Sequence, residues 1–453
     1  FLSFFETTIF DEREVHPLSF LSWLGRLIIM TQCAYHDQLI SIRRQLHQFP
    51  EEGWTEFCTT AFIVKHLREL GYEVLMGEKV ISRKDCLGRD PKLVAQAIET
   101  AKARGVEQAL LDEMQELTGC VAVLDTGRAG PTVALRFDID CNNVQENPSE
   151  EHRASKEGWA SKRPGLMHAC GHDSHISSGL AIARWAMEHK DELKGKLKIV
   201  FQPAEEGVRG AAAVAASGIV DDCDFFLSSH IAMMAKSGEI ITSPVGFLCT
   251  TKYDISFKGR PAHAGIEPNA GRNALAAACH CVTQLLGIPR HGAGMTRVNV
   301  GKITAGEGRN VIPVNAKLVM EVRGETGEIN QFMASETENI VEGVAKSFSV
   351  GYHIEKMGEA VDLFNDKELV DMLDDVCAHT DGVKKVLHEV NFGGSEDATI
   401  LARRVQAHGG KAAYFVLGSD RTGGHHTSDF DIDENSLDIG LNIYSEMLKR
   451  LMK

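Results

Sequence analysis

Side chains that could bind a metal gather in the segment 167–173, which reads Met-His-Ala-Cys-Gly-His-Asp. The thiol of Cys170 stands two residues before the imidazole of His172, and on an extended segment both would face the same way. Thiolate, imidazole and carboxylate are the ligands that proteins use for zinc and similar ions, and such sites activate water for hydrolysis. Further candidate ligands follow at separate points of the chain: Glu205, Glu206, His230 and His426.

Each of these signals is weak when taken alone. A Cys-x-His pair is more often a buried thiol beside a surface histidine, and a Glu-Glu pair is more often a solvated turn. The combination favours a metal site because each candidate follows a short apolar run that is typical of a buried strand. In open α/β sheets, sites form beyond the carboxyl ends of such strands. The runs cover residues 132–137, 196–201, 225–227 and 412–417.

The acidic pair and the last histidine pair each leave one choice open. Of two neighbouring carboxylates, one can bind a metal while the other accepts a proton from the attacking water. Physical reasoning from the sequence does not choose between His425 and His426 as the ligand. Two loops hold further candidates. His263 lies in the loop 259–265, where a functional role and none are equally favoured, and Arg309-Asn310 could bind a carboxylate or an oxyanion or form a simple turn.

The order of apolar runs predicts an α/β fold with an inserted unit. Strands and helices alternate over residues 36–245, interrupted by a helical insert at about 82–118, and α/β segments return before a final helix near 434–451. Between them the pattern is β-α-β-β-α-β, a ferredoxin-like arrangement. Its expected elements are 251–258, 270–287, 296–304, 315–323, 327–347 and 350–357. The predicted organisation is an extension (1–29), a catalytic α/β/α domain with a mixed sheet (30–246 and 361–453) and the inserted domain (247–360).

Composition restricts the partners and the compartment. The formal net charge of −15 argues against nucleic acid, because phosphate backbones are bound by basic surfaces. The 11 cysteines are odd in number and lack framework spacing, which predicts a reducing cytoplasm. Residues 1–29 lack an initiating Met and are interpreted as an extension of unknown relevance. Their apolar stretch 19–30 carries Arg26 and is too short to cross a membrane, so no membrane association is expected.

Taken together, these motifs resemble the aminoacylase/carboxypeptidase family of dinuclear metallohydrolases. The resemblance runs from about residue 40 to the C-terminus, and the set of motifs in this order is highly specific. The segments that carry it are RRQLHQFPE (43–51), RFDID (136–140), MHACGHDSH (167–175), FQPAEEG (201–207), GRPAHAG (259–265), GRNVIP (308–313), GSEDAT (394–399) and GHHTSDFDID (424–433).

The resemblance implies two divalent metal ions, with Mn²⁺ favoured and Zn²⁺ as the alternative. Cys170 would bridge the ions, Glu205 would act as the general base, and Asp138 would orient a ligand. His263 would reach the partner's active site in a dimer and polarise the scissile carbonyl. The inserted domain would serve as lid and dimerisation surface. The remaining metal ligands would be His172, Glu206, His230 and His426, and the substrate carboxylate would be held by Asn310 and Arg323, with Arg309 beside them.

Three features favour a subfamily that hydrolyses p-aminobenzoyl-glutamate to p-aminobenzoate and glutamate. They are the long helical insert, the sequence Gly207-Val208-Arg209-Gly210 after the acidic pair, and the Gly-His-His motif. This resemblance also implies a homodimer or a complex with a homologous second component. The alternative within the family is an N-acyl amino acid amidohydrolase or a dipeptidase. A thiol hydrolase with Cys170 as nucleophile would leave the acidic pair and His230 without roles, and the intact ligand set argues against a non-enzymatic binding protein.

Overall fold

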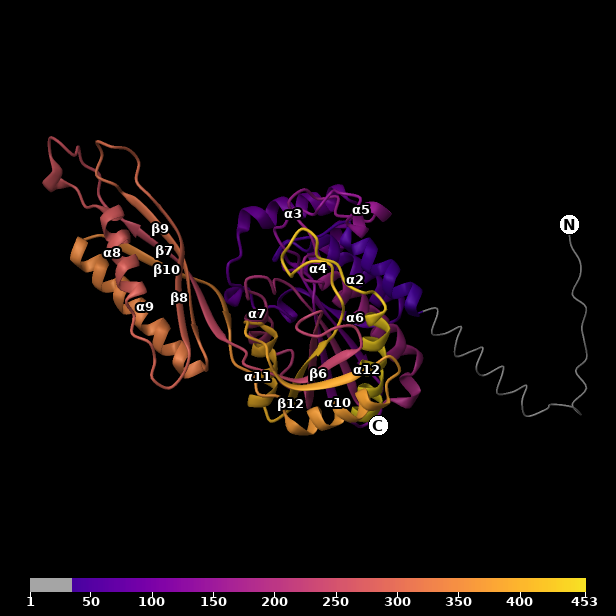
Figure 1. Ribbon diagram of the computed structural model, residues 1–453. Coiled ribbons are helices and arrows are strands. Elements are labelled where there is room, and N and C mark those ends of the chain that lie inside the picture. Colours follow the sequence, from indigo (N-terminus) through magenta and orange to yellow (C-terminus); the bar gives the residue numbers. More distant parts are fainter. Residues whose placement is uncertain (1–34) are drawn as a thin grey trace, which may run out of the picture.

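The computed structural model describes residues 35–453, so the expected extension 1–29 and its apolar stretch lie outside the described residues. The described chain forms two sheets. The larger has eight strands in the order β1-β2-β4-β3-β5-β12-β6-β11, and the smaller has four in the order β10-β7-β9-β8. Figure 1 shows the smaller sheet and its two helices standing beside a larger body. No helix within residues 35–453 is both long and apolar enough to cross a bilayer.

The large sheet is mixed, and its middle is parallel. Strand β3 runs parallel to β4 and β5, and β5 runs parallel to β12, whereas β1, β2 and β6 make antiparallel pairs. Parallel strands need cover on both faces, which explains their nearly continuous apolar sequences. The strands are β1 (Glu73–Leu75), β2 (Cys120–Asp125), β3 (Thr132–Asp138), β4 (Lys196–Gln202), β5 (Phe225–Ile231), β6 (Glu239–Val245), β11 (Lys385–Asn391) and β12 (Lys411–Leu417).

Helices cover both faces of this sheet. Phe415 of β12 packs against Tyr444 of α12, while its neighbour Tyr414 turns to the other face and donates to Glu396 beside α11. Successive strand residues point to opposite faces, so α12 and α11 lie on opposite sides. The helices are a segment over 35–47, α2 (Phe57–Glu69), α3 (Pro91–Ala103), α4 (Gln108–Met114), α5 (Arg153–Glu157), α6 (His172–Glu188), α7 (Ala211–Ala216), α10 (Lys367–His379), α11 (Ala398–Ala407) and α12 (Ser436–Leu451).

The chain between β6 and α10 forms the smaller sheet with the element order β-α-β-β-α-β. All three strand pairs are antiparallel, and α8 and α9 bury a separate apolar core against one face. Helix α8 begins four residues later than the sequence pattern predicts, because residues 268–270 form a 3₁₀ turn and Asn273 caps the helix through Ala276 N. The elements are β7 (Cys249–Lys258), α8 (Ala274–Leu286), β8 (Thr296–Ala305), β9 (Asn315–Gly324), α9 (Gly327–Phe348) and β10 (Gly351–Ala360).

The helical insert also forms where the sequence predicts it. Asp90 caps α3 by accepting a hydrogen bond from Lys92 N, and Pro91 occupies the first helical position. Gly105 ends this helix with a φ of 88°, a left-handed conformation that glycine adopts without strain. The insert lies between β1 and β2, at the edge of the large sheet.

Candidate metal centre

The candidate ligands converge at the carboxyl ends of four adjacent strands. Asp138 and Asp140 follow β3, Glu205 and Glu206 follow β4, and His230 lies at the end of β5. The histidine pair 425–426 follows β12. These strands are neighbours in the order β4-β3-β5-β12 and run parallel, so their ends meet at one edge. The reasoning from strand ends therefore locates this cluster correctly.

Cys170 and His172 reach the cluster by a route that differs from the expected extended segment. Gly171 has a φ of 85°, and His172 begins α6 directly after it. A Cβ at Gly171 would lie 2.9 Å from Ile231 Cγ2, so the turn also needs the missing side chain. His172 donates from Nδ1 to the backbone oxygen of Asp140 at 2.9 Å. That bond fixes the ring and turns Nε2 toward the cluster.

The distances between candidate donor atoms match those of ligands that share an ion. Cys170 Sγ lies 3.4 Å from His230 Nε2, and Glu206 Oε1 lies 4.0 Å from His172 Nε2 and 3.5 Å from His426 Nε2. Two donors bound to one tetrahedral ion lie about 3.3 to 3.8 Å apart. The donors form two compact groups, Cys170 with His172 and His230, and Cys170 with Glu206 and His426. Cys170 belongs to both groups.

Two buried atoms within these groups lack a hydrogen-bond partner. They are His172 Nε2 and Glu206 Oε1. A buried polar atom without a partner is costly, so such atoms call for a ligand. The donor set of one thiol, three imidazoles and one carboxylate also suits borderline transition metals. The residues present therefore fit two divalent ions that share Cys170.

Both histidines of the 425–426 pair approach the cluster. His425 donates from Nε2 to Ala232 O at 3.0 Å and places Nδ1 3.5 Å from Cys170 Sγ. Burial lowers the pKa of His425 to about 4, so the ring stays neutral. His426 has a left-handed φ of 61° that directs its ring to Glu206, and 55% of its side chain remains exposed. The structure thus gives His426 the Glu206 side of the cluster and gives His425 the side near His230.

Asp140 and Asp138 hold the surrounding groups in place. Asp140 accepts the backbone N–H of Glu205 at 3.0 Å and that of Glu206 at 2.9 Å, which fixes the acidic pair. Asp138 accepts a 2.5 Å hydrogen bond from His175 and lies 3.7 Å from His172 Nε2. The sequence notes Asp140 only as a residue after a strand. Its backbone oxygen, rather than a side chain of Asp138, makes the short contact that orients His172.

A buried charge network lies beneath the acidic pair, and the sequence reasoning missed it. Arg136 is fully buried and pairs with Asp138 at 2.7 Å, Asp397 at 3.0 Å and Glu396 at 3.1 Å. The signal that could have revealed it is an arginine inside the apolar run 132–137. Burial raises the pKa of Glu205 well above its usual range, and the charges of Glu396, Glu206 and Asp397 raise it further. A carboxyl group in such surroundings suits proton transfer.

The site residues expected in the inserted unit lie away from this cluster within one chain. His263 forms a bridge with Val311, and Ala264 N donates to Asn310 O at 3.0 Å, so both loops share one end of the unit, beyond the ends of β7 and β8. Arg309 lies in the same loop. Arg323 lies near the end of β9, opposite Thr250. Eight residue steps separate Arg323 from the start of β9, about 26 Å along a strand. One small substrate in one chain cannot contact both Asn310 and Arg323.

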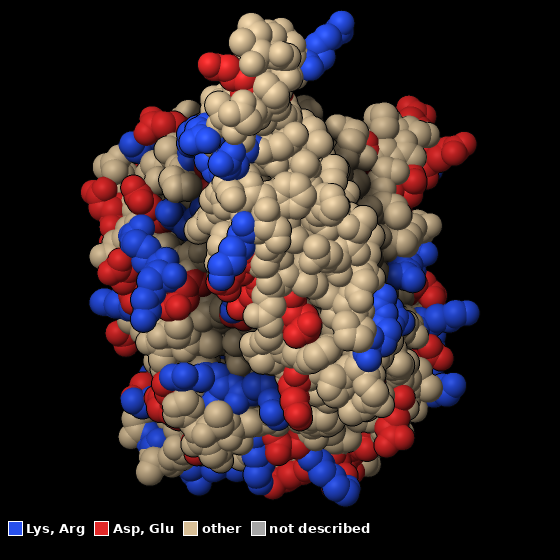
Figure 2. Space-filling model, turned by 90° about the vertical axis from the view of Figure 1, so that its left-hand side faces the viewer, with Lys and Arg blue, Asp and Glu red and all other residues tan. Residues whose placement is uncertain are grey.

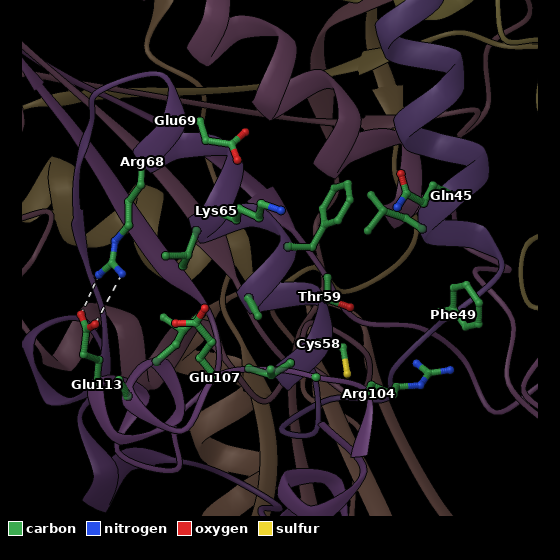
Figure 3. A pocket seen from close by; sticks show the side chains of 18 residues that line it. Gln45, Phe49, Cys58, Thr59, Lys65, Arg68, Glu69, Arg104, Glu107 and Glu113 are labelled. Atoms are coloured by element: carbon green, nitrogen blue, oxygen red, sulfur yellow. Dashed lines mark hydrogen bonds and ion pairs between the residues drawn. The ribbon is translucent and has the colours of Figure 1, made fainter. Parts of the chain in front are cut away.

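The largest cavity lies elsewhere. It has a volume of about 920 Å³ and lies between the helix over 35–47, α2 and the α3–α4 segment, none of whose lining residues belongs to the cluster (Figure 3). Lys65 and Cys58 project toward it from α2, while Arg68 of the same helix pairs with Glu113 at 2.6 Å. Its walls are largely apolar. This cavity therefore offers no catalytic groups for the cluster.

Comparison with known proteins gives consistent results. The model of peptidase family M20/M25/M40 matches residues 134–450. A Haemophilus influenzae homolog of the A chain of p-aminobenzoyl-glutamate hydrolase is 53% identical over 417 residues, which cover 92% of this chain and 99% of the relative. The indole-3-acetyl-aspartic acid hydrolase of Enterobacter agglomerans is 40% identical, with 88% and 92% covered. The crystal structure of an aminobenzoyl-glutamate utilization protein from Klebsiella pneumoniae is 34% identical, with a TM-score of 0.81 and 93% and 97% covered. The chain therefore belongs to peptidase family M20/M25/M40 and is a hydrolase that acts on amide bonds.

Proposed function

We propose that this protein hydrolyses p-aminobenzoyl-glutamate to p-aminobenzoate and glutamate with the help of two divalent metal ions. The observation that carries the proposal is the pair of donor groups that share Cys170, with Glu205 beside them. The substrate follows from the names of the Haemophilus influenzae and Klebsiella pneumoniae relatives. The Enterobacter agglomerans relative is named for an amide of aspartate, so an N-acyl amino acid is the second candidate substrate.

In this proposal Cys170 bridges the two ions. His172 and His230 complete the ligands on one side, and Glu206 and His426 complete them on the other. When bound, the ions would lower the pKa of a water molecule toward neutrality and polarise the scissile carbonyl. Mn²⁺ is favoured, and Zn²⁺ would also suit a thiolate ligand. We place the enzyme in the cytoplasm, in keeping with its unpaired cysteines.

Glu205 is the proposed general base. It accepts the proton of the attacking water and delivers it to the leaving amine. Its raised pKa suits the second step, because the protonated carboxyl is a competent acid near neutral pH. Asp140 keeps Glu205 in register with Glu206 by holding both backbone amides, and Asp138 supports the histidines around them. The base thus has a fixed position beside the ligands.

The inserted unit is proposed to act as a ferredoxin-like lid and dimerisation domain. Its sheet order and element order support that assignment. Because His263 and Asn310 lie together in the loops beyond the ends of β7 and β8, we propose that a second protomer supplies them to the cluster. Arg323 would bind the substrate carboxylate from the same chain, and Arg309 would assist beside Asn310. The second protomer is another copy of this chain or a homologous B chain, the counterpart that the A-chain name of the Haemophilus influenzae relative implies.

The environment of Cys170 argues against the rival thiol mechanism. Burial and the charge of Glu206 raise the pKa of the Cys170 thiol well above its usual value. Nucleophilic cysteines have lowered pKa values and are accessible. A nucleophile role would also leave the two donor groups around this thiol unexplained. The arrangement instead favours a thiolate that forms when a metal binds.

The test is metal-dependent release of p-aminobenzoate. Chelated enzyme is assayed on p-aminobenzoyl-glutamate with and without added Mn²⁺ or Zn²⁺, beside Glu205→Gln and a panel of N-acyl amino acids. We expect activity to return with metal and to fall by about 10²- to 10⁴-fold in Glu205→Gln, because the isosteric amide cannot accept the proton. Activity on the panel alone would refute the substrate. Full activity in the presence of chelator would refute the mechanism.

A further inference from the structure

Arg209 lies where the loop that carries Glu205 and Glu206 meets two other parts of the chain. Its Nε donates to the backbone oxygen of Glu206 at 2.8 Å, and its Nη1 lies 3.4 Å from the backbone oxygen of Gly88, which leads into α3 of the helical insert. A Cβ at Gly88 would lie 3.0 Å from Arg209 Cδ and 2.9 Å from the backbone oxygen of Met357 in β10. The helical insert, the acidic loop and β10 are therefore in close contact around one side chain.

Two more glycines make room at this junction. A Cβ at Gly53 would lie 2.3 Å from Arg209 Nη2, and a Cβ at Gly358 would lie 2.2 Å from the backbone oxygen of Gly207. Neither neighbour could keep its position if a side chain were added, because real Cβ contacts are not that short. Gly358 belongs to β10, at the base of the inserted unit. The inserted unit thus packs directly against the backbone of the acidic loop.

The backbone of the loop depends on these neighbours. Ala204 and Val208 have φ values of 53° and 57°, and the left-handed conformation is unusual for a β-branched residue such as valine. Strained residues persist only where their surroundings hold them. Glu359 N of β10 donates to Val208 O at 2.8 Å, so part of that hold comes from the inserted unit.

We propose that Arg209 and the segment 358–359 form one junction through which the orientation of the inserted unit sets the position of Glu205 and Glu206. The inserted unit joins the body only through the chain ends at β7 and β10, so any rotation of it acts at this place (Figure 1). Arg209 is a positioning residue in this scheme, since it binds the backbone of Glu206. The inference rests on the proposed function, in which Glu205 moves the proton.

Kinetics on p-aminobenzoyl-glutamate with Mn²⁺ test the junction from both sides. Arg209→Met keeps the length of the side chain but removes both hydrogen bonds, and Gly358→Ala forces the contact with Gly207 apart. Each change is expected to lower kcat roughly 10- to 100-fold with KM changed less than about threefold, because small displacements of a catalytic group are costly. Arg209→Lys, which can still donate to the Glu206 oxygen, should restore part of kcat. Gly343→Ala in α9 is the matched control, since a Cβ there meets nothing within 4 Å.

The double variant tests whether the two changes break one junction. Arg209→Met with Gly358→Ala should lose no more than the worse single variant, whereas independent sites would multiply their effects. Amide hydrogen exchange supplies a readout without substrate or metal. The segment 204–211 should exchange about tenfold faster in both single variants and as in the wild type in Gly343→Ala. Multiplying effects or unchanged exchange would overturn the junction. An inactive wild type would instead refute the proposed function, and the exchange experiment would still decide the junction.

The surface of the molecule agrees with a unit that can move as a whole. Figure 2 views the molecule from the side of the inserted unit, and most charged side chains there lie at the margins of a broad uncharged area. Helix α8 contributes to this character because it contains no Lys, Arg, Asp or Glu. Its own apolar core holds the unit together independently of the body. Rotation at the junction is therefore the motion that leaves the packing of both parts intact.

Discussion

A buried imidazolium beside the metal loop allows a quantitative prediction about stability. His47 is fully buried between two carboxylates, with Nδ1 2.7 Å from Asp173 and Nε2 3.0 Å from Glu146. Both ring nitrogens must donate, so the ring is protonated. Burial acts to lower the pKa of His47, but the hydrogen bonds to Asp173 and Glu146 outweigh it and raise the pKa to about 9.

The sign and size of the pH effect follow from this shift. A folded pKa above the unfolded value of 6.5 stabilises the protein fully below pH 6.5, and that stabilisation is lost as the pH rises through 9. A shift of about 2.5 units corresponds to about 3 kcal/mol. The variant His47→Gln cannot carry the charge and lacks this contribution. The difference in unfolding free energy between wild type and variant should therefore shrink by about 3 kcal/mol between pH 6 and pH 9.5.

Urea unfolding of both proteins at the two pH values measures this double difference. Groups other than His47 cancel in the comparison, and equal urea dependence would show that the denatured states are comparable. His379→Gln is the control, because its side chain is 73% exposed and its difference should stay within about 0.5 kcal/mol. A difference between wild type and His47→Gln that stays constant or grows with pH would refute the protonated, doubly bonded imidazole.

Three further predictions concern the site and its support. His426→Gln should lose about one of two bound metal ions per chain, whereas His425→Gln should keep both, as measured by metal analysis after dialysis. Arg136→Met should destabilise the fold by about 3 to 5 kcal/mol in denaturant unfolding, because Asp138 and its neighbours would keep buried charges without a partner; an effect below about 1 kcal/mol would contradict the network. Gly171→Ala should lower stability by about 1 to 3 kcal/mol and reduce metal binding, since its φ of 85° and its contact with Ile231 both exclude a side chain. Unchanged metal binding in this variant would show that the turn does not place Cys170 and His172.

Local chemistry made much of this protein legible from its sequence. Apolar runs that end at Asp138, Glu206 and His230 announce buried parallel strands, and parallel strands bring their carboxyl ends to one edge. Asp90-Pro91 and Gly105 bound a helix because capping and backbone freedom depend on the residues themselves. The β-α-β-β-α-β order of the inserted unit follows from hydrophobic periodicity in the same way.

Tertiary structure alone decided how these parts meet. The turn at Gly171, the pairing of Arg136 with Glu396 and Asp397, and the contact of Gly358 with Gly207 join segments that are distant in the sequence. No local pattern specifies such contacts, because they depend on the register and packing of whole elements. The same reason explains why the sequence names His263 and Arg323 but cannot show that they lie at opposite ends of one unit. Residue types and periodicity thus determined the elements and the chemistry, while packing in three dimensions determined which groups hold the chemistry in place.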